Sequence, residues 1–513
     1  MFKKISNSIT AHFLLLGAFT LILFREIFSM EFWKDDYTLL YRIQQKAQVL
    51  FAYPYQHFVR MHDFLYDAFK LEPLGYFIVG LFIFFISAVI FYFLVYDLFS
   101  KKSLAFIASL IYITSPLGVD CVFMMTTFAT GYLINVLFLI TLLFLFRYFK
   151  TKKFVYYCVS LVSLIILCEF LPHRTFYLPF IVMLFELVNF KMQKISSKKL
   201  LLRLIVLLSI FVYFFYLSPT FVYPAPARNH LGNLTSVFRG IVNWRLVFNP
   251  LFTVTNMIYA GFAYLIYHNF FINNSLFRSA ILIFTLLFLG YLFIKFRKRE
   301  AKFSRIFLFS VGYLYLTPLA FYPFSQREIS VASFRYLACG LPAFALFAVC
   351  VYLFLLKLYK NKTTLFRFLP QFIVMLVIII NAYSTRDYLK NFNSRSYYTR
   401  QFNSQFKDYV PQLPKNSIIY FDLDRDANIN YRLIDSYRVG VYDERAYFAV
   451  RYNLKVEDLI PIIVDYKQLV KFIKNDPQAI ERVFAFAYRE NGLINLIDET
   501  RSALTQVVKY PDN

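Results

Sequence analysis

The sequence predicts a polytopic, all-α membrane protein that is followed by a small soluble α/β domain. Two observations predict this class. Of the 513 residues, 59% are hydrophobic and only 17% are charged, whereas soluble domains are about a quarter charged. The apolar residues also gather in long runs that are separated by short basic clusters. With a mean hydropathy of +0.54, the chain is excluded from the soluble globular class.

The membrane segments are predicted from the length of the apolar runs, since a spanning helix needs about 20 predominantly apolar residues. Eleven segments of the sequence are candidates for such helices. They are residues 9–29, 74–97, 104–120, 126–147, 154–171, 175–190, 201–218, 276–295, 305–323, 334–356 and 368–384. The first of them follows Lys3 and Lys4 without a small-residue cleavage pattern, so we interpret it as an uncleaved membrane helix.

The basic clusters predict the orientation, because cytoplasmic loops carry an excess of Lys and Arg. With eleven helices all of these clusters face the cytoplasm, as does the N-terminus. The clusters are Lys3-Lys4, Lys101-Lys102 and residues 147–153, 191–203, 295–305 and 357–367. A twelfth apolar segment, residues 251–272, would break this parity and is predicted to be interfacial or re-entrant. The expected location is the plasma (inner) membrane of a bacterium.

Parity divides the chain into a membrane domain, residues 1–384, and an extracytoplasmic soluble domain, residues 385–513. The first outer loop of the membrane domain covers residues 30–73. The soluble domain contains more acids, Asn and Gln than the apolar segments before it. Ser417 to Phe421 has a strand pattern, and helical patterns lie around residues 456–475 and 477–504. The chemistry is expected on the outer side.

Charge and cysteine usage exclude other classes. The net charge of +25 comes from 55 Lys and Arg against 30 Asp and Glu, but the basic residues lie between apolar segments. This placement reflects membrane topology, so no nucleic-acid partner is predicted. The five cysteines lie in or beside apolar segments without a CxxC pattern, which favours neither a disulfide framework nor a zinc site.

The first outer loop opens with an acidic pair, Asp35 and Asp36, directly after the first membrane helix. A carboxylate close to a membrane-bound substrate can act as a general base or bind a cation. The alternative is an acidic helix N-terminus, because Asp in a first turn interacts favourably with the dipole of the helix that follows. Both interpretations are open on the local sequence.

Three further outer positions carry polar candidates. Asp120 follows a turn at Ser115-Pro116, where an acid either decorates the interface or belongs to a site. His173 and Arg174 lie at a second turn, where Arg174 also has Glu169 as a simple ion-pair partner. Arg335 begins a late membrane helix, where its guanidinium can extend to lipid headgroups or bind a phosphate through two hydrogen bonds.

The order of these pieces resembles the GT-C superfamily of membrane glycosyltransferases, which includes protein O-mannosyltransferases, lipid A aminoarabinose transferases and oligosaccharyltransferases. The resemblance covers about residues 1 to 384. It is carried by Phe32-Trp33-Lys34-Asp35-Asp36-Tyr37, Glu72-Pro73-Leu74-Gly75-Tyr76, Ser115-Pro116 and Arg335-Tyr336-Leu337. The order and sidedness of these motifs give the resemblance its weight.

The resemblance implies a sugar donor carried on a polyprenyl phosphate or pyrophosphate and an acceptor glycan, lipid or protein at the outer face. It implies that Asp35 or Asp36 is the base and that basic residues stabilise the leaving phosphate. Arg335 is the first candidate for that phosphate, followed by Arg174 and His173. Asp120 matches the place of a second acid, which orients the acceptor or holds a metal. A divalent cation is left open, and no other cofactor is implied.

Other functions fit a membrane chain of this length. One alternative is a non-catalytic transporter, flippase or scaffold in envelope glycan assembly. A transporter more often has paired repeats with broken helices at matching positions, and no such repeat is found in the sequence. A polysaccharide polymerase or ligase is a third alternative, which relies on arginines rather than on an acidic pair. A requirement for Asp35 or Asp36 discriminates between these functions.

Overall fold

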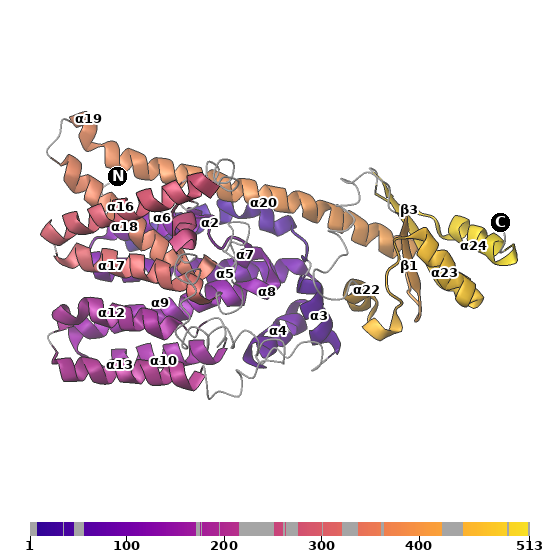
Figure 1. Cartoon of the computed structure of the whole chain (residues 1–513), viewed down its shortest axis with the longest axis horizontal. Coiled ribbons are helices and arrows are strands. Elements are labelled where there is room, and N and C mark those ends of the chain that lie inside the picture. Colours follow the sequence, from indigo (N-terminus) through magenta and orange to yellow (C-terminus); the bar gives the residue numbers. More distant parts are fainter. Residues whose placement is uncertain are drawn as a thin grey trace. The chain divides into compact units, whose positions relative to one another are not determined.

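A computed structural model describes most of the chain and divides it into two compact units (Figure 1). The first unit comprises Met1–Arg25, Ala52–Phe58 and Phe77–Tyr388, and the second comprises Glu26–Phe51, Val59–Tyr76 and Leu389–Asn513. The described residues are 8–33, 35–45, 56–170, 175, 177–193, 195–214, 251–259, 262, 275–299, 301–320, 337–360, 364–422, 445–489 and 492–510.

Apolar helices dominate the first unit, and each of the eleven predicted segments contains one. They are α2 (Ile9–Leu23), α5 (Pro73–Phe99), α6 (Lys102–Thr114), α9 (Ile134–Thr151), α10 (Phe154–Phe170), α12 (Leu178–Gln193), α13 (Ser197–Val212), α16 (Ser275–Arg299), α17 (Ala301–Leu316), α18 (Leu341–Tyr359) and α20 (Leu369–Tyr409). Within the described residues, four helices are long and apolar enough to cross a membrane: Pro73–Phe99, Gly131–Thr151, Leu337–Tyr359 and Leu369–Tyr409. The chain is a membrane protein, while the number of crossings stays a prediction.

Buried hydrogen bonds between helices hold the centre of the first unit. Tyr112 of α6 lies 2.9 Å from the Ser87 hydroxyl of α5 and accepts a hydrogen bond of 3.2 Å from Asn135 of α9. Asn135 also donates to the Ala338 carbonyl at 2.9 Å. Such bonds between polar side chains and neighbouring segments fix helix positions where apolar packing alone is unspecific.

The turn predicted between residues 115 and 125 is a buried insertion. The sequence predicts a helix to residue 120, but α6 ends at Thr114, and two short helices follow, α7 (Asp120–Phe123) and α8 (Met125–Phe128). A π-helical turn, Ala129–Leu133, leads into α9. Pro116 has no amide hydrogen for a helix, and Gly118 adopts a left-handed backbone with φ +83°. Every residue from Ile111 to Met125 is buried.

The segment predicted to be interfacial or re-entrant is described only in part. Residues 251–259 are helical, and Met257 within them is fully buried. A Cβ atom on Gly340 would lie 2.2 Å from the Met257 Cε atom, so this segment packs against the start of α18. The remainder of the predicted segment lies outside the described residues apart from Phe262.

A buried ion pair joins α12 and α13. The Arg203 guanidinium of α13 donates to Glu186 Oε2 at 3.2 Å and to Gln193 Oε1 at 2.6 Å. It lies over the rings of Tyr148 and Tyr157, 4.8 and 5.4 Å from their centroids.

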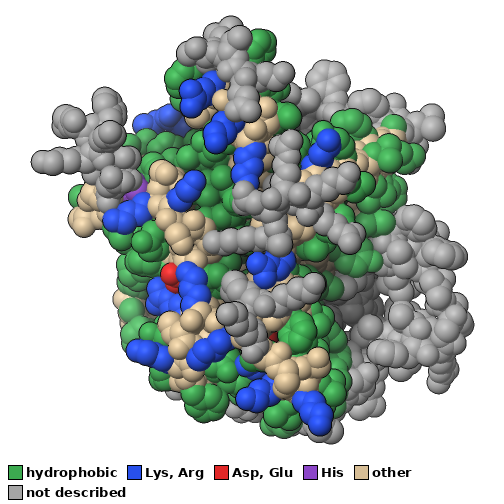
Figure 2. All heavy atoms as spheres, turned by 90° about the vertical axis from the view of Figure 1, so that its left-hand side faces the viewer, with side chains coloured by type: hydrophobic (Ala, Val, Ile, Leu, Met, Phe, Trp, Pro, Cys, Tyr) green, Lys and Arg blue, Asp and Glu red, His purple; other side chains and the backbone are tan. Residues whose placement is uncertain are grey.

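Figure 2 shows one face of the molecule on which Lys and Arg side chains gather with few acids among them.

The second unit contains a three-stranded sheet in the order β1-β2-β3. Strand β1 (Ile418–Asp422), the strand expected at residues 417–421, runs parallel to β2 (Val483–Arg489), with Ile418 opposite Val483. Strand β3 (Gly492–Asn495) is antiparallel to β2. The prediction of a helix over residues 477–504 is therefore wrong in part. Residues 483–488 form a short apolar run, which is consistent with a buried strand, and Gly492 at the start of β3 has φ +109°, which favours glycine.

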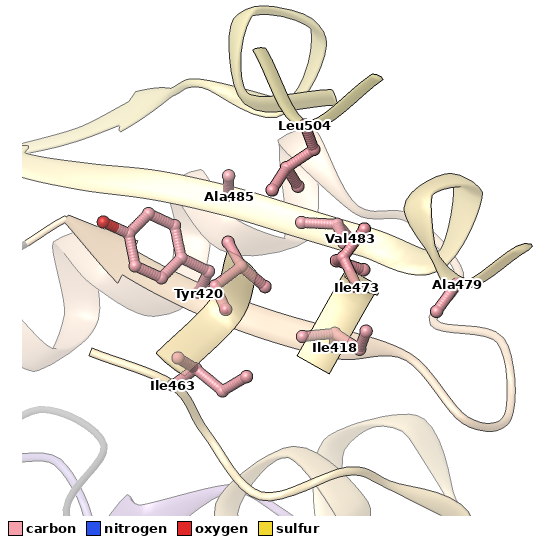
Figure 3. Close-up of a cluster of buried hydrophobic side chains, with 9 residues drawn as sticks. Ile418, Tyr420, Ile463, Ile473, Ala479, Val483, Ala485 and Leu504 are labelled. Atoms are coloured by element: carbon pink, nitrogen blue, oxygen red, sulfur yellow. The ribbon is translucent and has the colours of Figure 1, made fainter. Parts of the chain in front are cut away.

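Helices pack on this sheet and close a second hydrophobic core (Figure 3). The helices that contribute side chains to this core are α23 (Tyr466–Asn475), α24 (Ile497–Lys509) and the short helix η8 (Pro477–Arg482). The second unit also contains α22 (Arg445–Tyr452) and the short helix η7 (Val456–Asp458). The core consists of Ile418, Tyr420, Ile463, Leu469, Ile473, Ala479, Val483, Ala485 and Leu504. The remaining short helices among the described residues are η1 (Arg25–Ser29), η5 (Thr317–Ala320) and α19 (Thr364–Arg367).

The predicted first outer loop contributes α3 (Asp35–Gln45) and most of α4 (Gln56–Phe69) to the second unit. The last part of α20 joins them, because this helix continues without a break to Tyr409, well beyond the predicted end of its apolar segment at residue 384 (Figure 1). The second unit is thus assembled from three separate stretches of chain. The boundary predicted at residue 384 separates a membrane domain from a soluble domain, and it stays a prediction.

Candidate functional site

Asp36 forms the start of α3. Its amide donates to the Trp33 carbonyl at 2.7 Å, and its Oδ2 atom accepts the Trp33 amide at 3.0 Å. This reciprocal pair resembles a capping box, in which an acid of the first turn satisfies a backbone amide that the helix leaves open. Asp36 is fully buried. It therefore has the helix-start role that the sequence offered as one of two interpretations, while the Asp35 side chain lies outside the described residues.

Glu31 lies five positions before Asp36 and is the centre of a polar cluster. Its Oε2 atom accepts hydrogen bonds from Asn403 of α20 at 2.7 Å and from Arg451 of α22 at 3.4 Å. The Arg451 guanidinium also donates to the Tyr37 hydroxyl of α3 at 3.1 Å. Tyr447 of α22 donates to the Asn403 side-chain oxygen. We call these five residues the Arg451 cluster.

Aromatic rings enclose the guanidinium of this cluster. Arg451 lies over the rings of Tyr37 and Tyr447, 5.7 and 5.2 Å from their centroids. The two rings meet edge to face with centroids 4.8 Å apart. The side chains of Arg451 and Glu31 expose only 26% and 12% of their surface. The cation–π contacts and the Glu31 carboxylate together compensate the Arg451 guanidinium for its loss of contact with water.

Burial changes the acidity of this cluster. Loss of water raises the pKa of the Glu31 carboxyl, and the positive charges of Arg451 and Arg400 oppose that effect. Burial also raises the pKa of Tyr37 to about 12, so its hydroxyl keeps its proton at neutral pH. Perturbed acids are common at functional sites, although structural ion pairs perturb them as well.

Further hydrogen bonds dock α3 along its length. Gln44 and Gln45 donate to the carbonyls of Val450 and Leu454 at 3.2 and 3.1 Å. The Tyr41 hydroxyl accepts the Val456 amide at 2.9 Å. One face of α3 is thus held by α22 and by the segment that leads into η7.

Asp120 is the first residue of α7 in the first unit and is buried, with 6% of its surface exposed. The turn before it contacts the start of α18, since a Cβ atom on Gly118 would lie 2.6 Å from the Ala338 Cβ atom. Ala338 follows Arg335 by three positions. The structure therefore brings the Asp120 turn to the segment that follows Arg335.

The other candidates for the donor phosphate, Arg335, Arg174 and His173, lie outside the described residues. Asp36 lies in the second unit and Asp120 in the first. Among the described side chains, no group of three His, Cys, Asp or Glu residues is placed to hold a metal ion.

Sequence reasoning did not identify Arg451, Asn403 and Tyr447. The one available signal was Glu31 itself, an acid placed between the apolar residues Met30 and Phe32 at the end of the first membrane segment. An acid in such surroundings needs a partner. The sequence gives no indication that this partner lies in the C-terminal part of the chain.

No family model and no curated protein matches the chain. Among solved structures, the chain is similar to the archaeal oligosaccharyltransferase AglB from Archaeoglobus fulgidus in complex with an inhibitory peptide and a dolichol-phosphate. The identity is 12% and the TM-score 0.45, over 93% of this chain and 69% of that one. It is also similar to ArnT from Cupriavidus metallidurans bound to undecaprenyl phosphate, with 12% identity and a TM-score of 0.48 over 94% of both chains.

Proposed function

We propose that the chain is a membrane glycosyltransferase that moves a sugar from a polyprenyl-phosphate-linked donor to an acceptor at the outer face of the membrane. The observation that carries this proposal is the acidic pair at the start of α3, directly after the first apolar helix. One carboxylate of the pair is fixed in position, because Asp36 is fully buried and bonded to the Trp33 amide. Positioned acids next to a membrane suit proton transfer to or from a lipid-linked substrate.

In this reaction a carboxylate of Asp35 or Asp36 removes the proton of the acceptor group. The acceptor atom forms a bond to the anomeric carbon of the sugar, and the bond between that carbon and the phosphate oxygen breaks. The polyprenyl phosphate leaves with the electron pair. Positive charge near the phosphate lowers the barrier, because negative charge develops on the leaving oxygen.

Arg335 is our first choice for binding this phosphate, with Arg174 and His173 as further candidates. The contact of Gly118 with Ala338 supports this choice, since it fixes the beginning of the helix that follows Arg335. Asp120 is the second acid in the proposal. It lies in the buried turn that makes this contact and would orient the acceptor or hold a divalent cation there.

The test measures sugar transfer by purified protein in membranes with labelled sugars on undecaprenyl phosphate. Release of the polyprenyl phosphate is the readout, because it does not depend on the identity of the acceptor. Asp35→Asn and Asp36→Asn are compared with the unchanged protein. If Asp36 is the base, Asp36→Asn abolishes release. If it only starts the helix, Asp36→Asn retains release, because Asn also caps helices, and Asp35→Asn abolishes it.

Normal release by both variants would overturn the mechanism. Failure of the unchanged protein to release polyprenyl phosphate from any donor, combined with movement of the intact donor across the bilayer, would favour the transporter alternative.

A further inference from the structure

The structure points to a role for the C-terminal part of the chain that the sequence does not assign. We infer that Arg451 is a positioning residue for the acidic pair, and that it sets the place of the first turn of α3. This inference rests on the proposed function only for the catalytic role of the acidic pair. The placement itself rests on contacts within the second unit.

The contacts of Arg451 lie on both sides of the acidic pair. Its partners Glu31, which precedes α3, and Tyr37, in the first turn of α3, lie on either side of Asp35 and Asp36 in the sequence. A shift of the guanidinium therefore displaces the chain both before and after the acidic pair. The position of Asp36 depends on this path of the chain. Its carboxylate accepts the amide of Trp33, which lies between Glu31 and the acidic pair.

The rest of α3 is held by other residues. Gln44, Gln45 and Tyr41 attach the later turns of the helix to the segment 450–456. Loss of Arg451 therefore loosens the beginning of α3, where Asn403 still donates to Glu31, while the later turns of the helix stay docked. This separation makes a local effect at the acidic pair measurable.

The geometry of this position needs an arginine. The guanidinium reaches Glu31 and Tyr37 together while it lies over two aromatic rings. A planar fork with several N–H groups meets these demands, whereas a lysine carries the same charge as a compact, strongly hydrated point. Charge alone is not enough for this position, which makes Arg451→Lys the informative variant.

The experiment combines steady-state kinetics with hydrogen exchange of the full-length protein. In Arg451→Lys, the kcat for polyprenyl phosphate release is expected to fall by about tenfold to a hundredfold, because displacement of a catalytic group by about 1 Å costs that much. The donor KM is expected to change by less than about twofold. The amides of residues 37–40 should exchange about tenfold faster, while those of β1 and β2 keep their rates.

Tyr37→Phe tests the same contact with a smaller change, since it removes the hydroxyl partner at 3.1 Å but retains the ring. We expect the same pattern with a smaller loss of kcat. Arg482→Lys is the matched control, because Arg482 pairs with Asp476 at 2.7 Å in the same unit and contacts no residue of α3 among the described interactions. Its kinetics and exchange should match the unchanged protein.

Unchanged exchange at residues 37–40 in both Arg451→Lys and Tyr37→Phe would overturn the inference. So would equal acceleration of exchange in α3 and in the sheet, because Arg451 would then support the whole unit rather than the acidic pair. If the unchanged protein transfers no sugar, the proposed function fails, but the exchange measurement still decides whether Arg451 positions α3.

Discussion

Gly118 and Ala338 are in direct contact, although they lie far apart in the sequence. A Cβ atom on Gly118 would stand 2.6 Å from the Ala338 Cβ atom and 2.7 Å from its Cα atom. Gly118 also has φ +83°, which favours glycine. The backbone of the Asp120 turn therefore packs directly against the segment that leads into α18, and both the close contact and the positive φ require glycine.

Gly118→Ala is expected to lower the free energy of unfolding by about 1–3 kcal/mol, because it combines a left-handed residue with an overlap against Ala338. Thermal unfolding in detergent measures this change. Gly290→Ala is the matched control, since no atom lies within 4 Å of its added Cβ atom. In a helix this control should be neutral or stabilising by about 0.5–1 kcal/mol. Equal effects of the two changes would contradict the contact.

Asp36→Ala should destabilise the start of α3 by about 0.5–2 kcal/mol, because the Trp33 amide loses its acceptor. Asp36→Asn should cost much less, since its amide oxygen accepts the same bond. Hydrogen exchange of the Trp33 amide distinguishes the two variants. Equal exchange in both would mean that the carboxylate does not hold this turn.

Glu31 makes stability depend on pH in a defined direction. Burial raises its pKa above the ordinary value of 4.5, so the folded chain binds this proton more tightly than the unfolded chain. Its contribution to stability is therefore complete below pH 4.5 and is lost as the pH rises through the raised pKa. Unfolding of the protein and of Glu31→Gln, compared from pH 4 upward, measures this loss as a falling difference. A rising difference would show that the attraction of Arg451 outweighs burial.

Arg203→Ala should lower the free energy of unfolding by about 3–5 kcal/mol, because it leaves the Glu186 carboxylate buried without its cation. The two side chains expose only 10% and 1% of their surface. Lys199→Ala on the same helix is the control, since Lys199 is exposed and should change stability by less than about 0.5 kcal/mol. Comparable losses for both variants would refute the importance of the buried pair.

Arg335→Ala should raise the donor KM by about tenfold to a hundredfold, which is the range for a lost hydrogen bond to a charged group. The acceptor KM should stay within about twofold. Initial rates with donor and acceptor varied separately provide the measurement. An unchanged donor KM would assign Arg335 to the lipid headgroups instead of the phosphate.

Much of the helical architecture follows from hydropathy, because a membrane segment must be apolar along its whole length. The segment 74–97, for example, corresponds closely to α5. The length of α20 does not follow from hydropathy, since a helix continues wherever its backbone is not interrupted. The sequence contains neither Pro nor Gly between Pro370 and Pro411, and the helix ends at Tyr409. The position of the next proline therefore indicates the end of α20 better than the end of its apolar segment does.

The position of the acidic pair was predicted, and its neighbours were not. Asp36 lies at the start of a helix, as one of the two sequence interpretations required. Its surroundings depend on Glu31 and Arg451, which are separated by 420 positions. Nothing in a single sequence indicates which of 55 cations pairs with a given acid over such a distance. Non-local pairing of this kind is decided by the fold.

The assembly of the second unit from three stretches of chain has a consequence for biosynthesis. Residues 26–51 leave the ribosome early, whereas α22, which holds α3 in place, is made only after residue 444. Since domains fold as their residues emerge, the acidic pair reaches its final setting only after translation has passed all the apolar helices. A chain that stops early would carry both aspartates without the arginine that we infer to place them. Completion of the chain would thus act as a checkpoint on activity.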